Sequence, residues 1–158
     1  IFTIFYIGLD KPNFYTPKEL KNKSLEEFTS TELFSNEQFS SNNIIENNKF
    51  TLINIWSSWC VPCRLEHSVL MDLSEKTDLN IVGLNYKDKK NNAIKFLNEL
   101  GNPFSKILTD PDGIISISLG AYGVPETFLL NNKSKIIRKY IGPLTDDNIL
   151  EIIKITKS

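Results

Sequence analysis

The apolar and polar positions from residue 50 onward alternate between strand-like and helix-like segments. Residues 50–56 form a nearly continuous apolar run of strand length, which is typical of a strand buried on both faces. Residues 65–76 follow with apolar side chains at helical spacing, and residues 79–85 predict a second buried strand. Residues 91–100 then predict a helix that ends at Gly101. This order indicates a βαβ unit followed by a further helix.

The last third of the chain predicts a hairpin and a closing helix. Residues 110–113, Asp-Pro-Asp-Gly, form a turn by composition, and a short helix follows to Leu119. Residues 127–130 and 135–141 form a strand pair around a polar turn. Thr145 is predicted to cap a final helix that has acidic residues in its first turn and lysines near its end. Together the two halves predict an α/β fold, a central mixed β-sheet flanked by helices on both faces.

The N-terminal part of the chain is less regular. Residues 1–9 are almost wholly apolar but too few to span a bilayer, which needs about 20 residues. We interpret them as the remnant of an N-terminal membrane or signal anchor, the alternative being an apolar strand or an unstructured chain end. Residues 10–24, polar with two prolines, are predicted to be a linker before a domain at 25–158. Residues 27–34 suit an N-terminal β-hairpin extension, and residues 35–49 are predicted to be mostly loop.

Composition and charge exclude several classes of function. The 158 residues leave room for one domain with a hydrophobic core, and 41% apolar with 23% charged residues is ordinary for a soluble globular domain. The formal net charge of −1 gives no general attraction to nucleic acid or to an anionic membrane. We therefore expect no nucleic-acid partner, and a monomeric catalytic domain.

The chemistry is expected at the only two cysteines, Cys60 and Cys63. They lie between a predicted strand and a predicted helix, and their spacing places both sulfur atoms on one helical face. The first helical turn exposes unpaired N–H groups and the positive end of the helix dipole, which favours the nucleophilic thiolate. Pro62 fits this turn because N–H groups there lack helical partners. The pattern predicts a redox-active pair.

Three other interpretations of the cysteine pair are weaker. A zinc site needs about four ligands, which the chain could assemble only from both cysteines, the single histidine His67 and a glutamate. Covalent c-type haem attachment needs a histidine directly after the second cysteine, where Arg64 stands. A purely structural disulfide over three residues closes too small a loop to restrict the unfolded chain much. We therefore predict no metal and no cofactor.

The cysteine segment resembles a known family. Residues 54–67, NIWSSWCVPCRLEH, are similar to the active-site stretch of the thioredoxin superfamily, and more narrowly to its membrane-anchored cytochrome c biogenesis branch, the CcmG/DsbE family. Residues 83–88 (GLNYKD), 101–104 (GNPF) and 120–128 (GAYGVPETF) match the same branch, and the last block carries its cis-proline. The similarity runs from about residue 50 to 142.

The resemblance implies a thioredoxin-like fold and a specialised function. It implies a periplasmic domain held at the cytoplasmic membrane by an N-terminal anchor. There it would receive electrons from a membrane thiol reductase and keep the haem-binding cysteines of apocytochrome c, or of a partner thiol, reduced. The alternatives are a general extracytoplasmic thioredoxin-like reductase, a disulfide isomerase, or a redox-inert module that binds CxxC-containing clients.

Residues around the cysteines are assigned roles on this basis. Cys60, expected to be exposed, attacks the client disulfide, and the more buried Cys63 resolves the mixed disulfide. Trp59, Val61 and Pro62 are expected to contact the client, with Trp59 also shielding the pair. Val61 lies in the dipeptide between the cysteines and would tune the redox potential. Trp56, on the preceding strand, is expected to lie in the core.

Two acids and a proline complete the predicted site. Pro125 is expected to be cis and to present the backbone of Val124 to an extended client segment. Glu66 lies three residues after Cys63, hence on the same helical face, and Glu126 follows the proline. Either carboxylate could raise the thiol pKa or carry the proton of the resolving thiol.

Two further residues near the motif are expected to influence the site. Asn54 stands where general thioredoxins carry a buried aspartate, which makes Glu66 or Glu126 the proton acceptor instead. His67 could contact the site, or cap a helix, or lie on the surface, and the sequence leaves these alternatives open.

Overall fold

The architecture is a mixed five-stranded sheet with two covering layers. The computed structural model describes residues 23–45 and 47–157. The sheet has the order β5-β4-β3-β6-β7. Its strands are β3 (Phe50–Trp56), β4 (Asn80–Tyr86), β5 (Lys106–Asp110), β6 (Glu126–Asn131) and β7 (Ile136–Ile141). β3, β4 and β5 run parallel, whereas β6 and β7 are antiparallel to their neighbours. The predicted α/β fold with a central mixed sheet is confirmed.

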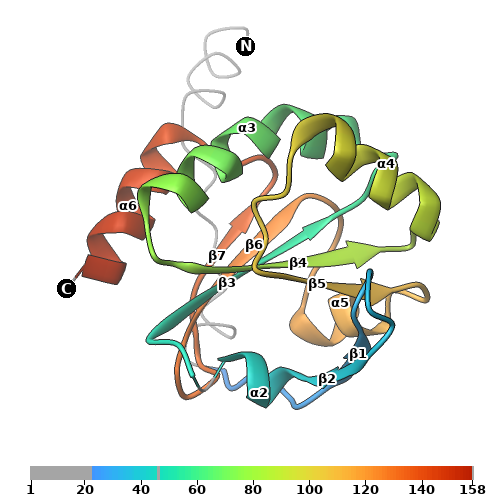
Figure 1. Cartoon of the computed structure of the whole chain (residues 1–158). Coiled ribbons are helices and arrows are strands. Elements are labelled where there is room, and N and C mark those ends of the chain that lie inside the picture. Colours follow the sequence, from blue (N-terminus) through green and yellow to red (C-terminus); the bar gives the residue numbers. More distant parts are fainter. Residues whose placement is uncertain (1–22, 46, 158) are drawn as a thin grey trace, which may run out of the picture.

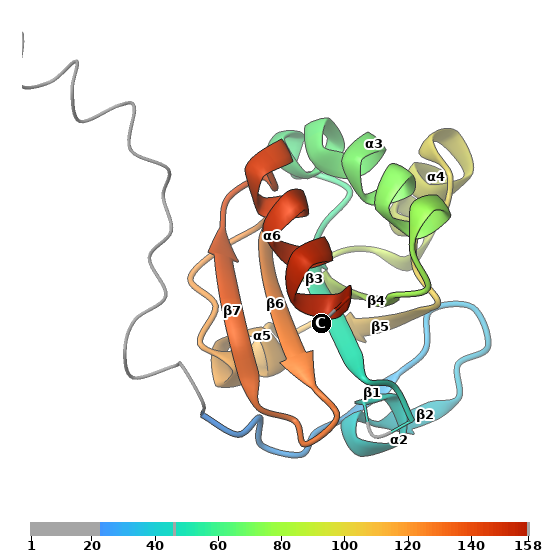
Figure 2. The same cartoon turned by 90° about the vertical axis from the view of Figure 1, so that its left-hand side faces the viewer.

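Helices cover both faces of this sheet, as the sequence predicts. One face carries α3 (Val61–Lys76), α4 (Lys90–Leu100) and α6 (Asp146–Lys157) (Figure 1). The other carries α2 (Ser41–Ile45), α5 (Ile114–Leu119) and the hairpin of β1 (Thr29–Thr31) and β2 (Gln38–Ser40). Turned by 90°, the structure shows β3, β6 and β7 side by side with α6 in front of them (Figure 2). The predicted N-terminal hairpin extension is therefore present.

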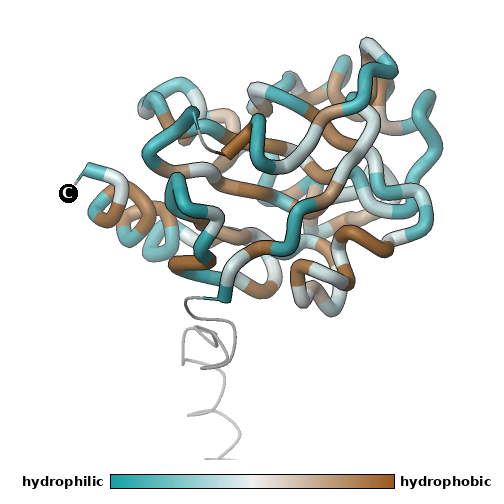
Figure 3. Tube along the Cα trace, turned by 90° about the horizontal axis from the view of Figure 1, so that it is seen from below, coloured by the Kyte–Doolittle hydropathy of each residue, from teal (hydrophilic) through white to brown (hydrophobic). Residues whose placement is uncertain are grey.

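β3 sits at the centre because nearly all of its side chains are buried. Alternate residues point to opposite faces of a strand, so Leu52 and Trp56 join the core beneath α3 and α4. Ile53 and Ile55 join the core on the α5 side. Asn54 shares the parity of Leu52 and Trp56, and this places its amide on the α3 face. Along the trace in Figure 3, short apolar and hydrophilic stretches alternate.

An aromatic group supports α3 from below. The ring centroid of Trp56, confirmed as a core residue, lies 5.0 Å from that of Phe96 and 5.6 Å from that of Phe104. Gly83 on β4 leaves the space for this packing, because a Cβ there would lie 2.8 Å from Trp56 Nε1 and 2.9 Å from Phe104 Cδ2. A larger residue at position 83 would require the side chain of Trp56 or of Phe104 to shift.

One prediction of secondary structure is wrong, and one strand was not predicted. The predicted loop at 35–49 contains β2 and α2, because Ile44 and Ile45 are buried and hold this polar stretch against the sheet. The strand β5 had no prediction, since only two adjacent apolar residues, Ile107 and Leu108, mark it. Its pairing with β4 and the contact of Leu33 N–H with Ile107 O, 2.8 Å, stabilise it instead.

The predicted anchor remnant, residues 1–9, and most of the predicted linker lie outside the described residues. Lys23, in the last part of that linker, already pairs with the sheet, since its carbonyl accepts a hydrogen bond from Ile136 N–H at 3.1 Å. Leu25 N–H likewise donates to Ser134 O at 2.7 Å. Within 23–45 and 47–157, none of the helices combines the length and the apolar character that crossing a membrane requires.

Candidate active site

The two cysteines form a disulfide at the junction of β3 and α3. The Cys60–Cys63 bond has an S–S length of 2.00 Å and a Cα–Cα distance of 5.3 Å. Cys60 is the N-cap residue of α3, and its Sγ accepts a hydrogen bond from Cys63 N–H at 3.1 Å. Pro62 lies in the first helical turn, as predicted. When the pair is reduced, the same N–H group and the helix dipole stabilise a thiolate on Cys60.

The expected exposure of Cys60 is wrong for this oxidised state. Cys60 is 4% exposed and Cys63 is 2% exposed, and both belong to the core cluster on the α3 side of the sheet. The bond to the buried Cys63 holds the Cys60 sulfur against this cluster. The neighbouring side chains Trp59 and Val61 are instead the exposed ones, at 56% and 69%. These two apolar side chains are thus exposed next to the disulfide in the chain, and their contact with a client stays a prediction.

The segment before Cys60 is held by the end of β4. The Asp88 carboxylate accepts hydrogen bonds from Ser58 N–H at 2.6 Å, from Ser58 Oγ at 2.8 Å and from Asn85 Nδ2 at 3.1 Å. Trp59 Nε1 donates to Lys87 O at 3.0 Å. Asp88 was not predicted as a site residue, although it lies in the GLNYKD block, because only the folded chain brings this block next to Ser58.

Glu66 lies buried beneath the first turn of α3. Its carboxylate accepts hydrogen bonds from Asn54 Nδ2 at 2.9 Å and from Leu144 N–H at 2.8 Å. Asn54 Nδ2 also donates to Thr127 Oγ1 at 2.9 Å, because these two residues are register partners on β3 and β6. Burial raises the pKa of Glu66 to about 7, even though both hydrogen bonds favour the ionised form. A buried acid with such a pKa can gain or lose a proton near neutral pH.

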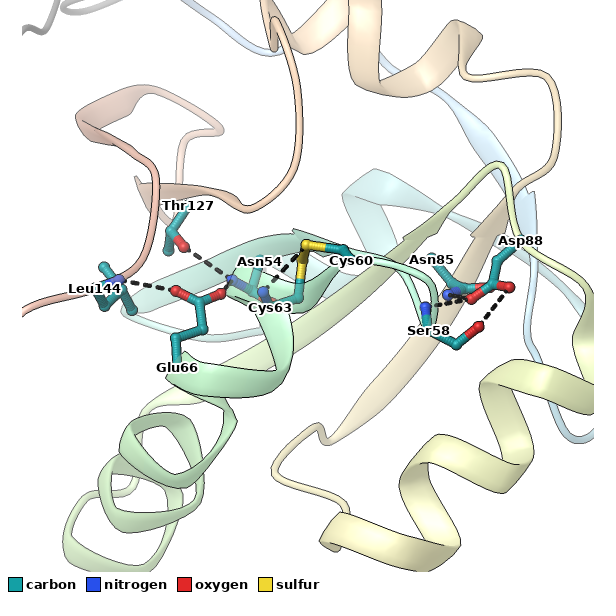
Figure 4. The surroundings of a disulfide bond; sticks show 9 residues. All are labelled: Asn54, Ser58, Cys60, Cys63, Glu66, Asn85, Asp88, Thr127 and Leu144. Carbon is teal, nitrogen blue, oxygen red and sulfur yellow. Dashed lines mark hydrogen bonds between the residues drawn. A yellow bond between two sulfur atoms is a disulfide. The ribbon is translucent and has the colours of Figure 1, made fainter.

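Figure 4 shows how these groups surround the disulfide. Glu66, Asn54, Thr127 and Leu144 lie on one side of it, and Ser58, Asn85 and Asp88 lie on the other. The structure thus brings together the predicted residues Cys60, Cys63, Glu66 and Asn54.

The predicted cis-proline is present. The Val124–Pro125 peptide bond is cis, and Val124 packs against the core cluster that contains Cys60 and Cys63. Val124 also packs against the core cluster on the other face of the sheet. The contact of Val124 and Pro125 with a client stays a prediction.

Glu126, the second predicted acid, faces away from α3. It is opposite Ile55 in the sheet register, and Ile55 belongs to the core on the α5 side. Lys139 Nζ lies 2.8 Å from Glu126 Oε2, and both side chains are buried. The other oxygen accepts hydrogen bonds from the N–H groups of Tyr122 and Gly123, at 2.7 and 2.9 Å. The sheet therefore separates two acids that the sequence prediction grouped around the cysteines.

His67 lies in the core rather than on the surface. It is 3% exposed, and its ring stands edge-on to that of Phe96 with centroids 5.0 Å apart. His67 Nε2 donates to Gly101 O at 2.9 Å, which ties α3 to the end of α4. Burial lowers the pKa of His67, so the ring stays neutral. Among the described residues, no group of three or more His, Cys, Asp and Glu side chains is arranged to hold a metal ion.

The chain is similar to known proteins in sequence and in fold. The Redoxin family profile matches residues 20–153. The thiol:disulfide interchange protein CycY of Rhizobium leguminosarum bv. viciae is 48% identical over 65% of this chain and 55% of its own length. DsbE-2 of Pasteurella multocida, also named a thiol:disulfide interchange protein, is 35% identical over 91% of this chain and 75% of its own.

A solved structure agrees with these sequence matches. The crystal structure of a DsbF homologue from Corynebacterium diphtheriae superposes with a TM-score of 0.73 at 25% identity and covers 90% of each chain. The predicted thioredoxin-like fold is thereby confirmed. The aligned part of the chain spans little more than half of CycY and three quarters of DsbE-2. The chain belongs to the Redoxin family of the thioredoxin superfamily, in its DsbE/CycY group of thiol:disulfide interchange proteins.

Proposed function

We propose that this chain is a periplasmic thiol:disulfide oxidoreductase that acts as a reductant in cytochrome c maturation. The observation that carries the exchange chemistry is the Cys60–Cys63 pair at the N-terminus of α3, where Cys63 N–H already donates to Cys60 Sγ. The maturation role is supported by similarity to relatives named DsbE and CycY and by the family blocks along the sequence. A membrane anchor formed with residues 1–9 would hold the domain near its partners.

The first chemical step joins the protein to its client. In the reduced protein, the Cys60 thiolate attacks one sulfur of a client disulfide, for example that of an apocytochrome c haem-binding motif. A Cys60–client disulfide forms, the client S–S bond breaks, and the departing client thiolate takes up a proton from water.

The second step releases the reduced client. The Cys63 thiol passes its proton to the Glu66 carboxylate and attacks Cys60 Sγ, which forms the Cys60–Cys63 disulfide and frees the second client thiolate. The client gains two electrons and the protein loses two. A membrane dithiol reductase then returns the pair to the reduced state. Glu66 suits the proton transfer because its pKa of about 7 is near the operating pH.

Trapping the mixed disulfide tests the proposal. Cys63→Ala stops the reaction after the first step, so it is expected to accumulate a covalent complex with a disulfide-closed Cys-x-x-Cys-His peptide, visible by mass spectrometry. Cys60→Ala is the matched control and forms no complex. Absence of a complex with Cys63→Ala would exclude a redox role toward this client and favour a binding module.

A second measurement separates the reductant from an isomerase or a general reductase. Equilibration with glutathione is expected to give a potential in the reducing range of thioredoxin, about −270 mV, and not that of a strong oxidase near −120 mV. Deleting the gene in its host is expected to remove c-type cytochromes while other disulfide-containing periplasmic proteins stay correctly paired. A broad disulfide defect with intact cytochromes would favour the general reductase or the isomerase.

A further inference from the structure

A buried lysine lies beneath the loop that precedes β6. Lys139, in the middle of β7, is 1% exposed and is opposite Phe128 in the register of β6 and β7. Directly opposed residues point to the same face of a sheet, so Lys139, Phe128 and Glu126 share the face away from α3. An ammonium group is almost never buried to this degree unless its charge is compensated, so its contacts show what it stabilises.

Lys139 Nζ contacts several groups of residues 120–128. The ammonium lies 2.8 Å from Glu126 Oε2 and donates to Gly120 O at 2.8 Å. It also lies 4.1 Å from the centroid of the Tyr122 ring and 5.4 Å from that of Phe128. Tyr122 is 78% exposed, so the cation beneath it holds an aromatic side chain that faces solvent.

Glu126 extends this arrangement to the backbone of the loop. Its Oε1 accepts the N–H groups of Tyr122 and Gly123, while its Oε2 contacts Lys139. The Lys139–Glu126 ion pair is therefore in contact with the start, the middle and the end of the segment 120–126, and these contacts form a closed ring. Val124, at the cis-proline, lies within this segment and packs against the core clusters on both sides of the sheet, one of which contains Cys60 and Cys63.

We propose that Lys139 is a positioning residue for client recognition, acting through Glu126 and the loop 120–126. Its charge holds Gly120, Tyr122 and Glu126 in one arrangement, and this sets the shape of the surface that an extended client segment meets beside the disulfide. Glu126 is then a fixed anion of the loop and not the proton carrier for Cys63. The inference rests on the proposed function, because it assumes a peptide client.

Substitution of Lys139 tests whether the shape of the loop 120–126 affects client recognition independently of the reactivity of the cysteines. We compare the rates at which reduced proteins react with a disulfide-closed Cys-x-x-Cys-His peptide and with glutathione disulfide, which is too small to use the whole loop. Lys139→Met is expected to lower the ratio of the two rates by on the order of 10- to 100-fold, as misplacement of a binding element by about 1 Å does. Lys139→Arg keeps the charge and most of the ratio.

The matched control is Arg138→Met on the same strand. Arg138 Nε pairs with Glu151 Oε1 at 2.8 Å and its Nη1 donates to Ile137 O at 2.9 Å, so its loss is expected to leave the ratio unchanged. The double variant Glu126→Gln/Lys139→Met covers the case in which the single variant unfolds. It removes both buried charges together, which proteins tolerate better than removing one, and it is expected to fold with a lowered ratio.

Amide hydrogen exchange gives a readout that needs no client. In Lys139→Met, or in the double variant, the amides of Tyr122 and Gly123 are expected to exchange at least about tenfold faster than in wild type, a loss of protection worth about 1.4 kcal/mol. Unchanged exchange at both amides, or an equal loss of rate toward peptide and glutathione disulfide, would overturn the positioning role. Failure of the proposed function is a different result, in which wild type itself leaves the peptide oxidised.

Discussion

Two buried glutamates that flank the site, Glu66 and Glu126, lie in contrasting surroundings. Glu66 and Glu126 are 2% and 1% exposed, and each accepts backbone N–H groups. Glu66, on the α3 face, otherwise contacts the neutral amide of Asn54. Glu126, on the α5 face, contacts the ammonium of Lys139. Residue type and burial are thus nearly the same, and the charge of the main partner differs.

Because their partners differ in charge, the two glutamates are suited to different chemistry. Burial next to a neutral amide disfavours the carboxylate and raises the pKa of Glu66 to about 7, so this group can exchange a proton near neutral pH. A buried cation compensates the charge of Glu126 and uses it to hold a loop. Closeness to the cysteine motif along the sequence is therefore a poor guide to which glutamate transfers protons. The charge of the group that each glutamate contacts is a better guide.

Replacing Glu66 is expected to give the largest kinetic effect. Glu66→Gln removes the proton acceptor of Cys63, which should slow resolution of the mixed disulfide by about 10²-fold at pH 7. Stopped-flow measurement of Trp fluorescence from pH 5 to 9 follows this step. The wild-type rate is expected to rise with a midpoint near pH 7, and the variant to lose that midpoint. Glu126→Gln is the control, and the comparison fails if it, too, removes the midpoint.

The stability of the oxidised protein should depend on pH through Glu66. The folded-state pKa of about 7 lies above the ordinary value of 4.5, so the folded state binds more protons between these values. The stability that Glu66 contributes is complete below pH 4.5 and is lost as pH rises through about 7, a change on the order of 3 kcal/mol.

Urea unfolding of wild type and Glu66→Gln at pH 4.5 and pH 8 measures this change. The free energy of unfolding of wild type is expected to fall relative to the variant as pH rises. A difference between the two proteins that stays constant with pH would show that Glu66 does not titrate in this range.

Changing the partner of Glu66 sharpens the comparison further. Asn54→Asp replaces the neutral amide by a second carboxyl group, which is expected to raise the midpoint of the resolution rate by about one pH unit, or about 1.4 kcal/mol. Thr127→Val is the control, because it removes the other hydrogen-bond partner of Asn54 without adding charge. A midpoint that moves equally in both variants would point to loosened packing as the cause.

Asp88 is a third carboxylate near the disulfide, and its role is to hold the segment before Cys60. Asp88→Ala leaves Ser58 N–H and Asn85 Nδ2 without their acceptor, and a loss of about 1–2 kcal/mol in the free energy of unfolding is expected. Lys87, next to Asp88, accepts the hydrogen bond of Trp59 Nε1, so the fluorescence of Trp59 is expected to become more quenched by solvent. The exposed Asp78→Ala serves as the matched control and should change neither quantity.

The exposed ion pair near the cysteines should have the smallest effect. Arg64 and Glu99 are paired at 2.8 Å, yet their side chains are 41% and 53% exposed. Glu99→Gln is therefore expected to change the free energy of unfolding by less than about 0.5 kcal/mol, and added salt should reduce the difference. A loss as large as that expected for Asp88→Ala would contradict the importance given to burial.

Much of the fold was predictable because its signals are local. The continuous apolar run of β3, the helical spacing in α3 and α4, and the turn at 110–113 each depend on neighbouring residues. The strand β5 and the helix α2 were not predictable in this way, since each has only two buried apolar residues and depends on contacts with distant segments.

The site, too, has features that follow from local sequence and features that depend on contacts between distant segments. Residue types and spacing alone determined the Cys60–Cys63 pair at a helix N-terminus, and family motifs added the cis-proline and both glutamates. Only the tertiary structure decided that Glu66 meets Asn54 and that Glu126 meets Lys139, because strand register selects which side chains share a face. The sequence identifies the two acids, whereas the tertiary structure determines the partner that each one meets, since desolvation and a facing charge act over a few ångströms in space regardless of separation along the chain.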